Sequence, residues 1–263
     1  MRSRLAYLYV LPAAALLGVF CYWPFLGALK LAFYESDGLS ANAFVGLANF
    51  RRLAADPQFA HSFKVLGLFA LGLPLGVLGP FVGAKLIHGL ASNRAAYAYR
   101  VLFVLPVVVP MMTVVLVWRD LYGPDGAVNR LLQALGLAEW TTTWLGAPAT
   151  VIPALIFMGM PWVGGISMLL YLAGFIRIPK SLYESARLDG ASALDVLARI
   201  EMPLLVPQFR IVAILAVLGL IQSYDAVLVL TNGGPGDATT VPGLYLFKNG
   251  FEYGQLGYAS AIG

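Results

Sequence analysis

Charged residues, cysteine and histidine are scarce in this chain of 263 residues, and each scarcity excludes a class of protein. Only 11% of the residues are charged while 60% are hydrophobic, so the chain cannot present the polar surface that a soluble enzyme needs. Disorder is excluded too, because disordered chains combine low hydrophobicity with high net charge. The single cysteine, Cys21, excludes a disulfide framework and a thiolate metal site. The two histidines, His61 and His88, lie far apart in the sequence, and we expect neither to bind a metal.

The net charge of +4 and the sequence pI of about 9.2 do not indicate a nucleic-acid-binding protein. The 17 basic residues are spread between apolar runs and form no basic face. Membrane topology explains them better.

Long apolar runs are what the sequence does have. A membrane-spanning helix needs about 20 apolar residues. Five runs are long enough: about Leu5–Phe33, Phe63–Ile87, Val101–Trp118, Thr150–Phe175 and Phe209–Leu230. The chain stops at Gly263 inside a new apolar pattern, LGYASAIG, which we interpret as the opening of a sixth span that is cut short. We expect an all-α polytopic membrane helix bundle that forms one transmembrane domain over residues 1–263.

The first run has a rival interpretation as a signal peptide, because Arg2 and Arg4 precede it. Its apolar stretch is roughly twice the length of a signal-peptide core and lacks a clean small-residue cleavage site. We therefore predict a retained span. Several spans contain prolines, which membrane helices tolerate where neighbouring groups satisfy the freed backbone. Gly72, Gly76, Gly79 and Gly83 are spaced for close helix packing.

The distribution of basic residues predicts the orientation. With the N-terminus inside, residues 1–4, 85–100 and 176–210 face the cytoplasm and hold ten basic and four acidic residues. The remainder holds seven basic and nine acidic residues. This asymmetry follows the positive-inside rule, so we predict a cytoplasmic N-terminus. Outside, we expect short surface helices starting near Leu47 and within AVNRLLQALG, and a turn-rich stretch at TNGGPGDATT.

The segment between the fourth and fifth spans, about residues 176–208, is too long and too patterned to be a simple connection. Pro179 is suited to start a helix, and Gly190 to end it. Apolar residues then recur at helical spacing from Ala191 to Ile200. Pro203 and Pro207 prepare the return to the membrane. An amphipathic helix outside the bilayer lies either among lipid headgroups or in a groove of a partner. Acidic residues here favour the protein partner.

The same segment carries a specific motif. Glu184-Ser185-Ala186, Asp189-Gly190-Ala191 and, eight residues later, Ile200-Glu201-Met202-Pro203 resemble the EAA loop of ABC importer permeases, with Ser185 and Met202 departing from the family pattern. Stretches such as VLPAAALLGVFCYWPF, YRVLFVLPVVVP and LTNGGPGDATT extend the resemblance over nearly the whole chain, to MalF/UgpA-type carbohydrate importers without the long outer domain of the maltose protein.

The resemblance implies a six-span type I ABC importer permease fold and a coupling loop that binds a cytoplasmic ATPase. The matching residues are Glu184, Ala186, Asp189, Gly190, Ala191 and Pro203. It also implies three protein partners: ATPase subunits, a second and non-identical permease subunit, and an extracytoplasmic solute-binding protein. We expect no cofactor. We also expect no ATP hydrolysis by this chain, because GFIRIPKS has Pro179 where a phosphate loop needs its second glycine.

Polar and aromatic residues within the spans are candidates for the substrate path. These are Trp162, Ser167, Gln222, Ser223 and Tyr224. Aromatic faces and hydrogen-bonding side chains suit an uncharged sugar, while a glycerol-phosphate or polyol substrate stays an alternative. An ion-coupled secondary transporter would need paired buried carboxylates or an internal repeat, and the sequence shows neither.

Overall fold

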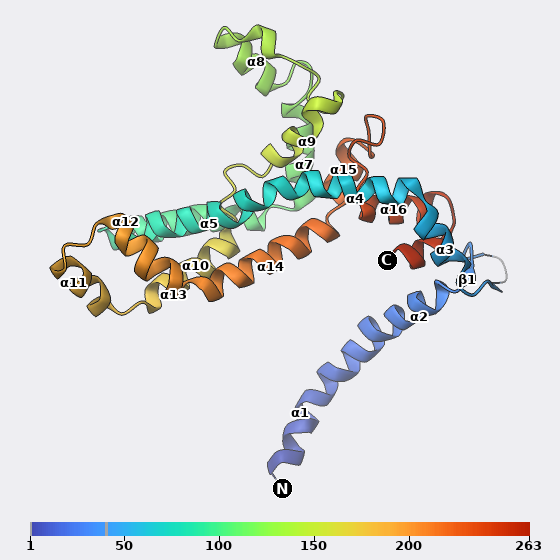
Figure 1. Ribbon diagram of the computed structural model, residues 1–263, viewed down its shortest axis with the longest axis horizontal. Coiled ribbons are helices and arrows are strands. Elements are labelled where there is room, and N and C mark those ends of the chain that lie inside the picture. The colour runs from blue at the N-terminus through green and yellow to red at the C-terminus, as the bar shows by residue number, and fades with distance from the viewer. Residues whose placement is uncertain (1, 40–41) are drawn as a thin grey trace. The chain divides into compact units, whose positions relative to one another are not determined.

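The computed structural model describes residues 2–39 and 42–263, and nearly all of its regular structure is helical (Figure 1). The chain divides into two compact units, Met1–Phe63 with Val241–Gly263, and Lys64–Thr240. The first unit contains α1 (Arg2–Leu17), the π-helical η1 (Gly18–Tyr22), α2 (Trp23–Leu31), β1 (Tyr34–Glu35), β2 (Ala43–Phe44), α3 (Ala48–Ala55), α16 (Pro242–Phe247), η6 (Lys248–Glu252) and α17 (Leu256–Ile262). Helix α4 (Pro57–Phe69) begins there and continues into the second unit.

The second unit holds the other elements. They are η2 (Ala70–Gly72), α5 (Leu73–His88), α6 (Asn93–Val104), η3 (Leu105–Val108), α7 (Met111–Leu121), α8 (Ala127–Ala134), η4 (Ala138–Trp140), α9 (Pro148–Phe157), α10 (Gly165–Arg177), α11 (Lys180–Leu188), α12 (Ala193–Val196), η5 (Leu197–Glu201), α13 (Met202–Leu204), α14 (Val206–Gln222) and α15 (Asp225–Leu230). The helices predicted near Leu47 and within AVNRLLQALG are therefore present as α3 and α8.

Three helices of the described residues are long and apolar enough to cross a membrane: Tyr9–Leu31, Pro57–His88 and Val206–Leu230. They correspond to the first, second and fifth predicted spans. None of the most apolar window of Tyr9–Leu31 is buried within this chain, so its surface is left for lipid or another protein.

The third and fourth predicted spans are not continuous helices, which corrects their prediction as simple spans. The third bends by 91° between Asn93–Val108 and Met111–Leu121. Pro106 and Pro110 explain the bend, because proline lacks the N–H that helix continuation requires. The fourth consists of two shorter helices, α9 and α10, separated at residues 158–164 by a segment that contains Pro161 and Gly164.

Helices α5, α10 and α14 pack against one another and form the core of the second unit (Figure 1). Its centre is aromatic: the ring of Phe81 lies 5.6 Å from that of Tyr171 and 5.0 Å from that of Phe209. The rings of Tyr171 and Phe209 are 4.8 Å apart. Such edge-to-face and tilted ring pairs contribute about 0.5–1.5 kcal/mol each beyond area burial. The three helices therefore each contribute one ring to a shared aromatic cluster.

Glycines allow α5 and the turn before it to approach their neighbours closely. Of the four glycines that the sequence spacing singled out, three are packed in this way. A Cβ added at Gly72 would lie 3.1 Å from Ile156, one at Gly83 would lie 2.9 Å from Val163, and one at Gly79 would collide with the Trp162 carbonyl oxygen. Gly76 is different, because a Cβ there would meet open space. Among the described residues of this chain, Gly76 therefore makes no such close packing.

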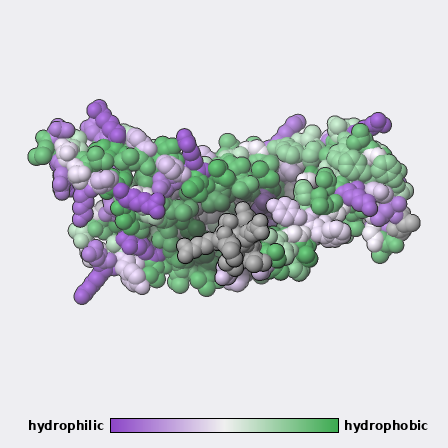
Figure 2. All heavy atoms as spheres, turned by 90° about the horizontal axis from the view of Figure 1, so that it is seen from below, coloured by the Kyte–Doolittle hydropathy of each residue, from purple (hydrophilic) through white to green (hydrophobic). Residues whose placement is uncertain are grey.

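On the face in Figure 2, hydrophilic side chains gather at the end of the second unit that carries α11 and α12, while hydrophobic side chains cover the helices beside it. Exposed apolar residues of these helices include Leu86 (67%) and Ile214 (60%). An apolar helix surface beside a polar end is the pattern expected where helices leave a bilayer.

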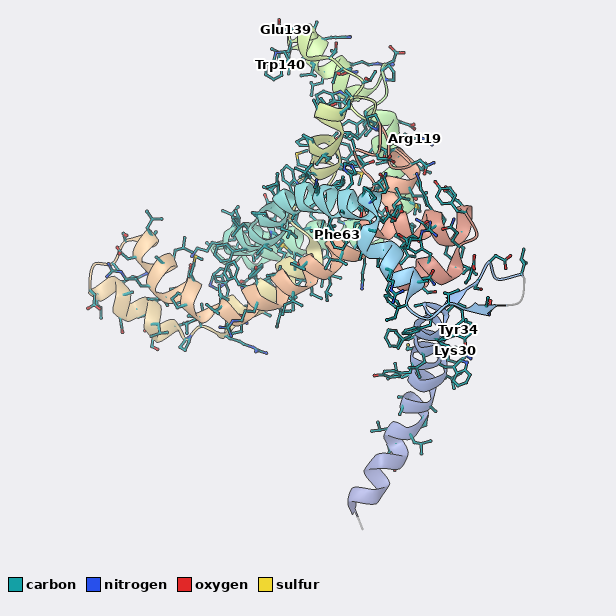
Figure 3. The ribbon with its side chains drawn as sticks, turned by 45° about the vertical axis from the view of Figure 1, so that its right-hand side comes forward. Lys30, Tyr34, Phe63, Arg119, Glu139 and Trp140 are labelled. Atoms are coloured by element: carbon teal, nitrogen blue, oxygen red, sulfur yellow. The ribbon has the colours of Figure 1, made fainter. Side chains whose placement is uncertain are left out.

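The first unit is tied together by a carboxylate. The hydroxyls of Tyr245 and Tyr258 both donate to Asp56 Oδ2, and the Arg52 guanidinium lies 3.9 Å from the centre of the Tyr258 ring. At the end of α2, Lys30 lies 5.8 Å from the centre of the Tyr34 ring (Figure 3). Burial raises the pKa of Asp56, but the hydrogen bonds from the two tyrosines and from backbone amides outweigh it, so the pKa lies below the ordinary value of 3.8.

Ionised Asp56 therefore favours the folded chain at neutral pH, and this contribution is lost as the pH falls through 3.8 toward the lowered pKa. Replacing Asp56 by asparagine is expected to destabilise the chain by about 1–2 kcal/mol at pH 7 and less at acidic pH. Thermal unfolding in detergent at pH 7 and near pH 3.5 measures the difference. The exposed carboxyl Asp125 gives the matched control, Asp125→Asn. Equal destabilisation by Asp56→Asn at both pH values would contradict the assignment.

Candidate functional site

The segment that carries the sequence motif folds as two short helical limbs joined by a tight turn. The first limb, α11, begins after Pro179, as predicted, and its last turn closes through bonds from the Gly190 amide to the Arg187 carbonyl (3.1 Å) and from the Ala191 amide to the Ala186 carbonyl (2.9 Å). Gly190 has φ = +72°, a left-handed conformation that glycine adopts without strain. The predicted role of Gly190 as the turn residue is therefore confirmed.

The second limb begins with a capping box. The Ser192 hydroxyl accepts from the Asp195 amide, and the Asp195 carboxylate accepts from the Ser192 amide. These bonds satisfy otherwise unpaired groups at the start of α12. The limb continues through η5 and α13 to α14, with Pro203 exposed on α13 and Leu205 completely buried beneath it. The capping box and the buried Leu205 therefore fix both ends of the second limb.

The tip of the loop presents both charge and apolar surface to the outside. Glu184 and Asp189 are exposed, whereas Ala186 is buried and anchors α11. Two leucines beside the turn are also exposed, Leu188 by 89% and Leu194 by 75%. Apolar side chains next to acidic ones on a polar end of the molecule are typical of a protein-binding surface.

Beneath the tip, a cavity of 590 Å³ contains an ion pair that the sequence did not reveal. Lys85, at the end of α5, donates to both carboxylate oxygens of Glu201, and the Tyr183 hydroxyl donates to Glu201 Oε1 at 3.2 Å. Burial and the Glu201 carboxylate raise the pKa of Tyr183 to about 12, so its hydroxyl remains a donor at neutral pH. Lys85 and Glu201 are 116 positions apart. The one sequence signal is a glutamate within an apolar stretch.

The break between α9 and α10 places Trp162 at a bend of the chain. Trp162 has φ = +51°, which is unusual for a residue with a bulky side chain, and its Nε1 donates to the Ile156 carbonyl at 3.0 Å. Gly79 of α5 lies directly against its backbone. Backbone strain of this kind persists where surrounding contacts fix the conformation, and it clusters at functional sites.

A cavity of 460 Å³ lies beside this bend and brings together three of the five predicted path residues: Trp162, Ser167 and Ser223. Its remaining lining comes from α4, η2, α5, α9 and α14: Phe69, Gly72, Leu73, Gly76, Ile156, Val212, Leu215, Ala216, Gly219 and Leu220. None of these lining residues is ionisable. Gln222 and Tyr224 flank Ser223 in the chain but do not line this cavity.

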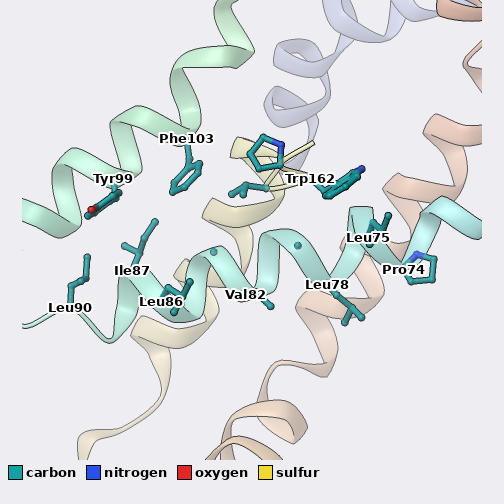
Figure 4. A pocket seen from close by; sticks show the side chains of 14 residues that line it. Pro74, Leu75, Leu78, Val82, Leu86, Ile87, Leu90, Tyr99, Phe103 and Trp162 are labelled. Atoms are coloured by element: carbon teal, nitrogen blue, oxygen red, sulfur yellow. The ribbon is translucent and has the colours of Figure 1, made fainter. Parts of the chain in front are cut away.

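A second cavity, of 690 Å³, lies on another side of α5 and is almost entirely apolar. Figure 4 shows Tyr99 and Phe103 of α6 on one side of this cavity and the α5 residues Leu86 and Ile87 on the other. Trp162, from the segment between α9 and α10, lines the cavity nearer the start of α5. Trp162 therefore borders both cavities. The mixed polar and aromatic lining of the smaller cavity makes it the better candidate for a hydrated ligand.

A family model described as "Binding-protein-dependent transport system inner membrane component" matches residues 72–261. The chain is 32% identical to the "Probable ABC transporter permease protein YurN" of Bacillus subtilis (strain 168), over 97% of this chain and 88% of that protein. It is 30% identical to the "Multiple sugar-binding transport system permease protein MsmF" of Streptococcus mutans, over 93% and 83% of the two chains.

Among solved structures, the chain is similar to one in "a bacterial ABC transporter involved in the import of the acidic polysaccharide alginate". The TM-score is 0.84 at 26% sequence identity, over 99% of this chain and 89% of that chain. The all-α permease fold expected from the sequence is therefore confirmed.

Proposed function

Because the chain belongs to the family of inner-membrane components of binding-protein-dependent transport systems, and is thus a multi-pass membrane permease, we propose that it forms a translocation path for an uncharged sugar and couples it to a cytoplasmic ATPase. One observation carries this proposal. A rigid, exposed helical turn stands at one end of the same three packed helices, α5, α10 and α14, whose residues also line the cavity at Trp162. An energy-coupling surface and a substrate cavity thus share a single helical frame.

The coupling loop supplies the contacts with the ATPase. Glu184 and Asp189 are exposed and offer charge-assisted hydrogen bonds to basic groups of a partner, which are roughly twice as strong as neutral ones. Leu188 and Leu194 add apolar contact area beside them. Gly190 and Ala191 keep the turn narrow, so that it fits a groove, while the buried Ala186 anchors the first limb and Pro203 directs the chain back toward α14. ATP hydrolysis itself occurs in the partner subunit.

The substrate is expected to be a sugar without charge. Trp162 offers an aromatic face, and Ser167 and Ser223 offer hydroxyls at the cavity wall, which together suit the alternating apolar and polar faces of a sugar ring. A relative whose printed name describes a multiple sugar-binding system supports this class. An anionic substrate would need cationic side chains in the lining, and the described lining contains none. Gln222 and Tyr224 adjoin this wall and extend the path.

The experiment that tests the proposal is mass spectrometry of the proteins and small molecules that co-purify with the tagged full-length protein from native membranes. We expect an ABC ATPase, a second and non-identical permease and an extracytoplasmic solute-binding protein that retains an uncharged sugar. Two results together would overturn the coupling role: recovery of the tagged protein without any ATPase, and uptake that survives ATP depletion. A binding protein that retains an anion would overturn the substrate class alone.

A further inference from the structure

The coupling loop contains a buried charge that contact with an ATPase does not require. Glu201 is only 1% exposed, yet it lies at the base of the loop rather than at its tip. Its charge is met by Lys85, whose ammonium group donates to both carboxylate oxygens, and by the Tyr183 hydroxyl. Three separate elements therefore meet at one carboxylate: α5 through Lys85, the first limb through Tyr183, and the second limb through η5.

The ion pair is poor evidence for stability, because Glu201 is buried and loses its hydration while the Lys85 side chain is 37% exposed, so that solvent screens part of the attraction. It is better evidence for fixed geometry, since a bidentate contact sets both distance and orientation. Other contacts at the same point agree. The ring of His88 stacks on that of Phe175 at 5.2 Å, and the Lys85 ammonium lies 5.7 Å from the centre of the Phe175 ring. These two contacts join the end of α5 to α10, whereas the Lys85–Glu201 contact joins it to the loop, so the end of α5 cannot slide past the loop without breaking the ion pair.

The other end of the same helix forms the wall of the candidate substrate cavity. Gly76 is nine residues from Lys85, or about 13 Å along the helix axis. Between them, Gly79 and Gly83 are packed against Trp162 and Val163 of the bend so closely that an added Cβ would clash. A displacement of the loop that moves Lys85 must therefore move both the cavity wall and Trp162.

We propose that Lys85, Glu201 and Tyr183 are positioning residues that transmit movement of the coupling loop through α5 to the candidate substrate cavity, and transmit substrate arrival in the reverse direction. This inference rests on the coupling role proposed above. It differs from that role because it concerns the base of the loop and not the surface that binds the ATPase. The reverse direction can be measured directly, because substrate arrival is then expected to raise the rate of ATP hydrolysis.

The test uses the complete complex with its ATPase and partner permease in lipid vesicles, together with the co-purified binding protein carrying its own sugar. The readout is the factor by which this loaded binding protein stimulates ATP hydrolysis. The double variant Lys85→Met/Glu201→Leu removes both charges and keeps apolar volume. We expect it to assemble, to melt close to the wild type and to keep basal hydrolysis, but to lose at least about tenfold of the stimulation. If the ion pair were merely structural, a double variant that keeps wild-type stability would also keep wild-type stimulation.

Arg199→Met is the matched control. Arg199 forms an exposed ion pair with Asp195, at 3.4 Å, that lies within the second limb and does not reach α5. Stimulation in this variant is expected to stay within about twofold of the wild type, since exposed pairs contribute little. Tyr183→Phe removes one hydroxyl and leaves the ion pair, so it assembles even if the double variant does not. We expect it to lose about threefold of the stimulation, in line with one hydrogen bond.

Wild-type stimulation in the double variant, or in Tyr183→Phe where the double variant fails to assemble, would overturn the inference. A tenfold loss in Arg199→Met would do so too, because it would show that any change in the loop uncouples the complex. If the wild-type complex itself shows no stimulation by the loaded binding protein, the proposed function fails instead. The two failures are therefore distinguishable.

Discussion

Replacing Glu184 by lysine is expected to lower binding of the ATPase subunit roughly 100-fold and to abolish ATP-dependent uptake. Glu184 is exposed on α11 and forms part of the rim of the 590 Å³ cavity, so the substitution leaves the fold of the loop unchanged. Removing one partner of an interfacial charge pair costs about 2–5 kcal/mol, and a reversed charge adds repulsion to that loss. A cost of about 3 kcal/mol corresponds to roughly 100-fold in affinity.

Binding of the purified ATPase to the permease in nanodiscs measures the effect, and uptake in vesicles measures its consequence. Glu139→Lys is the matched control, because Glu139 is an equally exposed glutamate on the η4 segment near Trp140 (Figure 3). That variant is expected to bind the ATPase as the wild type does. Unchanged ATPase binding by Glu184→Lys would show that the acidic residue does not contact the partner, and the assignment of the loop tip would be wrong.

The sequence predicted the helix, turn and helix of residues 176–208 well because their structure is local. Helix start at Pro179, the turn at Gly190 and the restart after it depend on residues within one or two turns of each other. The ion pair below the loop could not be predicted in this way. Lys85 and Glu201 are 116 positions apart, and only the packing of α5 against the loop brings them together.

The membrane helices show the same division. Length and hydropathy were enough to place Pro57–His88 and Val206–Leu230. They did not reveal that the third and fourth spans are broken. A membrane helix can continue through a proline or end at it, and the outcome depends on whether neighbouring helices satisfy the freed backbone groups. At the bend that holds Trp162, Gly79 has no side chain, so α5 lies directly against the backbone of the broken segment. This explains why the aromatic candidate was found from the sequence and its cavity was not.

Filling that cavity from its α14 wall is expected to stop transport without harming the fold. Gly219 lines the cavity, and a Cβ added there meets no atom within 4 Å, so Gly219→Leu places a side chain in open space. Leucine in place of a helical glycine also stabilises the helix by about 0.5–1 kcal/mol. A substrate that must share the cavity would be excluded at a cost of about 3 kcal/mol, or roughly 100-fold in uptake.

Gly67→Leu is the control for this substitution. Gly67 is also a helical glycine with nothing within 4 Å of an added Cβ, but it lies on α4 outside the cavity lining. Both variants are therefore expected to gain thermal stability, and only Gly219→Leu is expected to lose uptake of the sugar found on the binding protein. Because the two changes share their helix propensity and their steric freedom, a difference in uptake reports on the cavity itself. Equal uptake by both variants would remove this cavity from the path and, with it, the assignment of Trp162, Ser167 and Ser223.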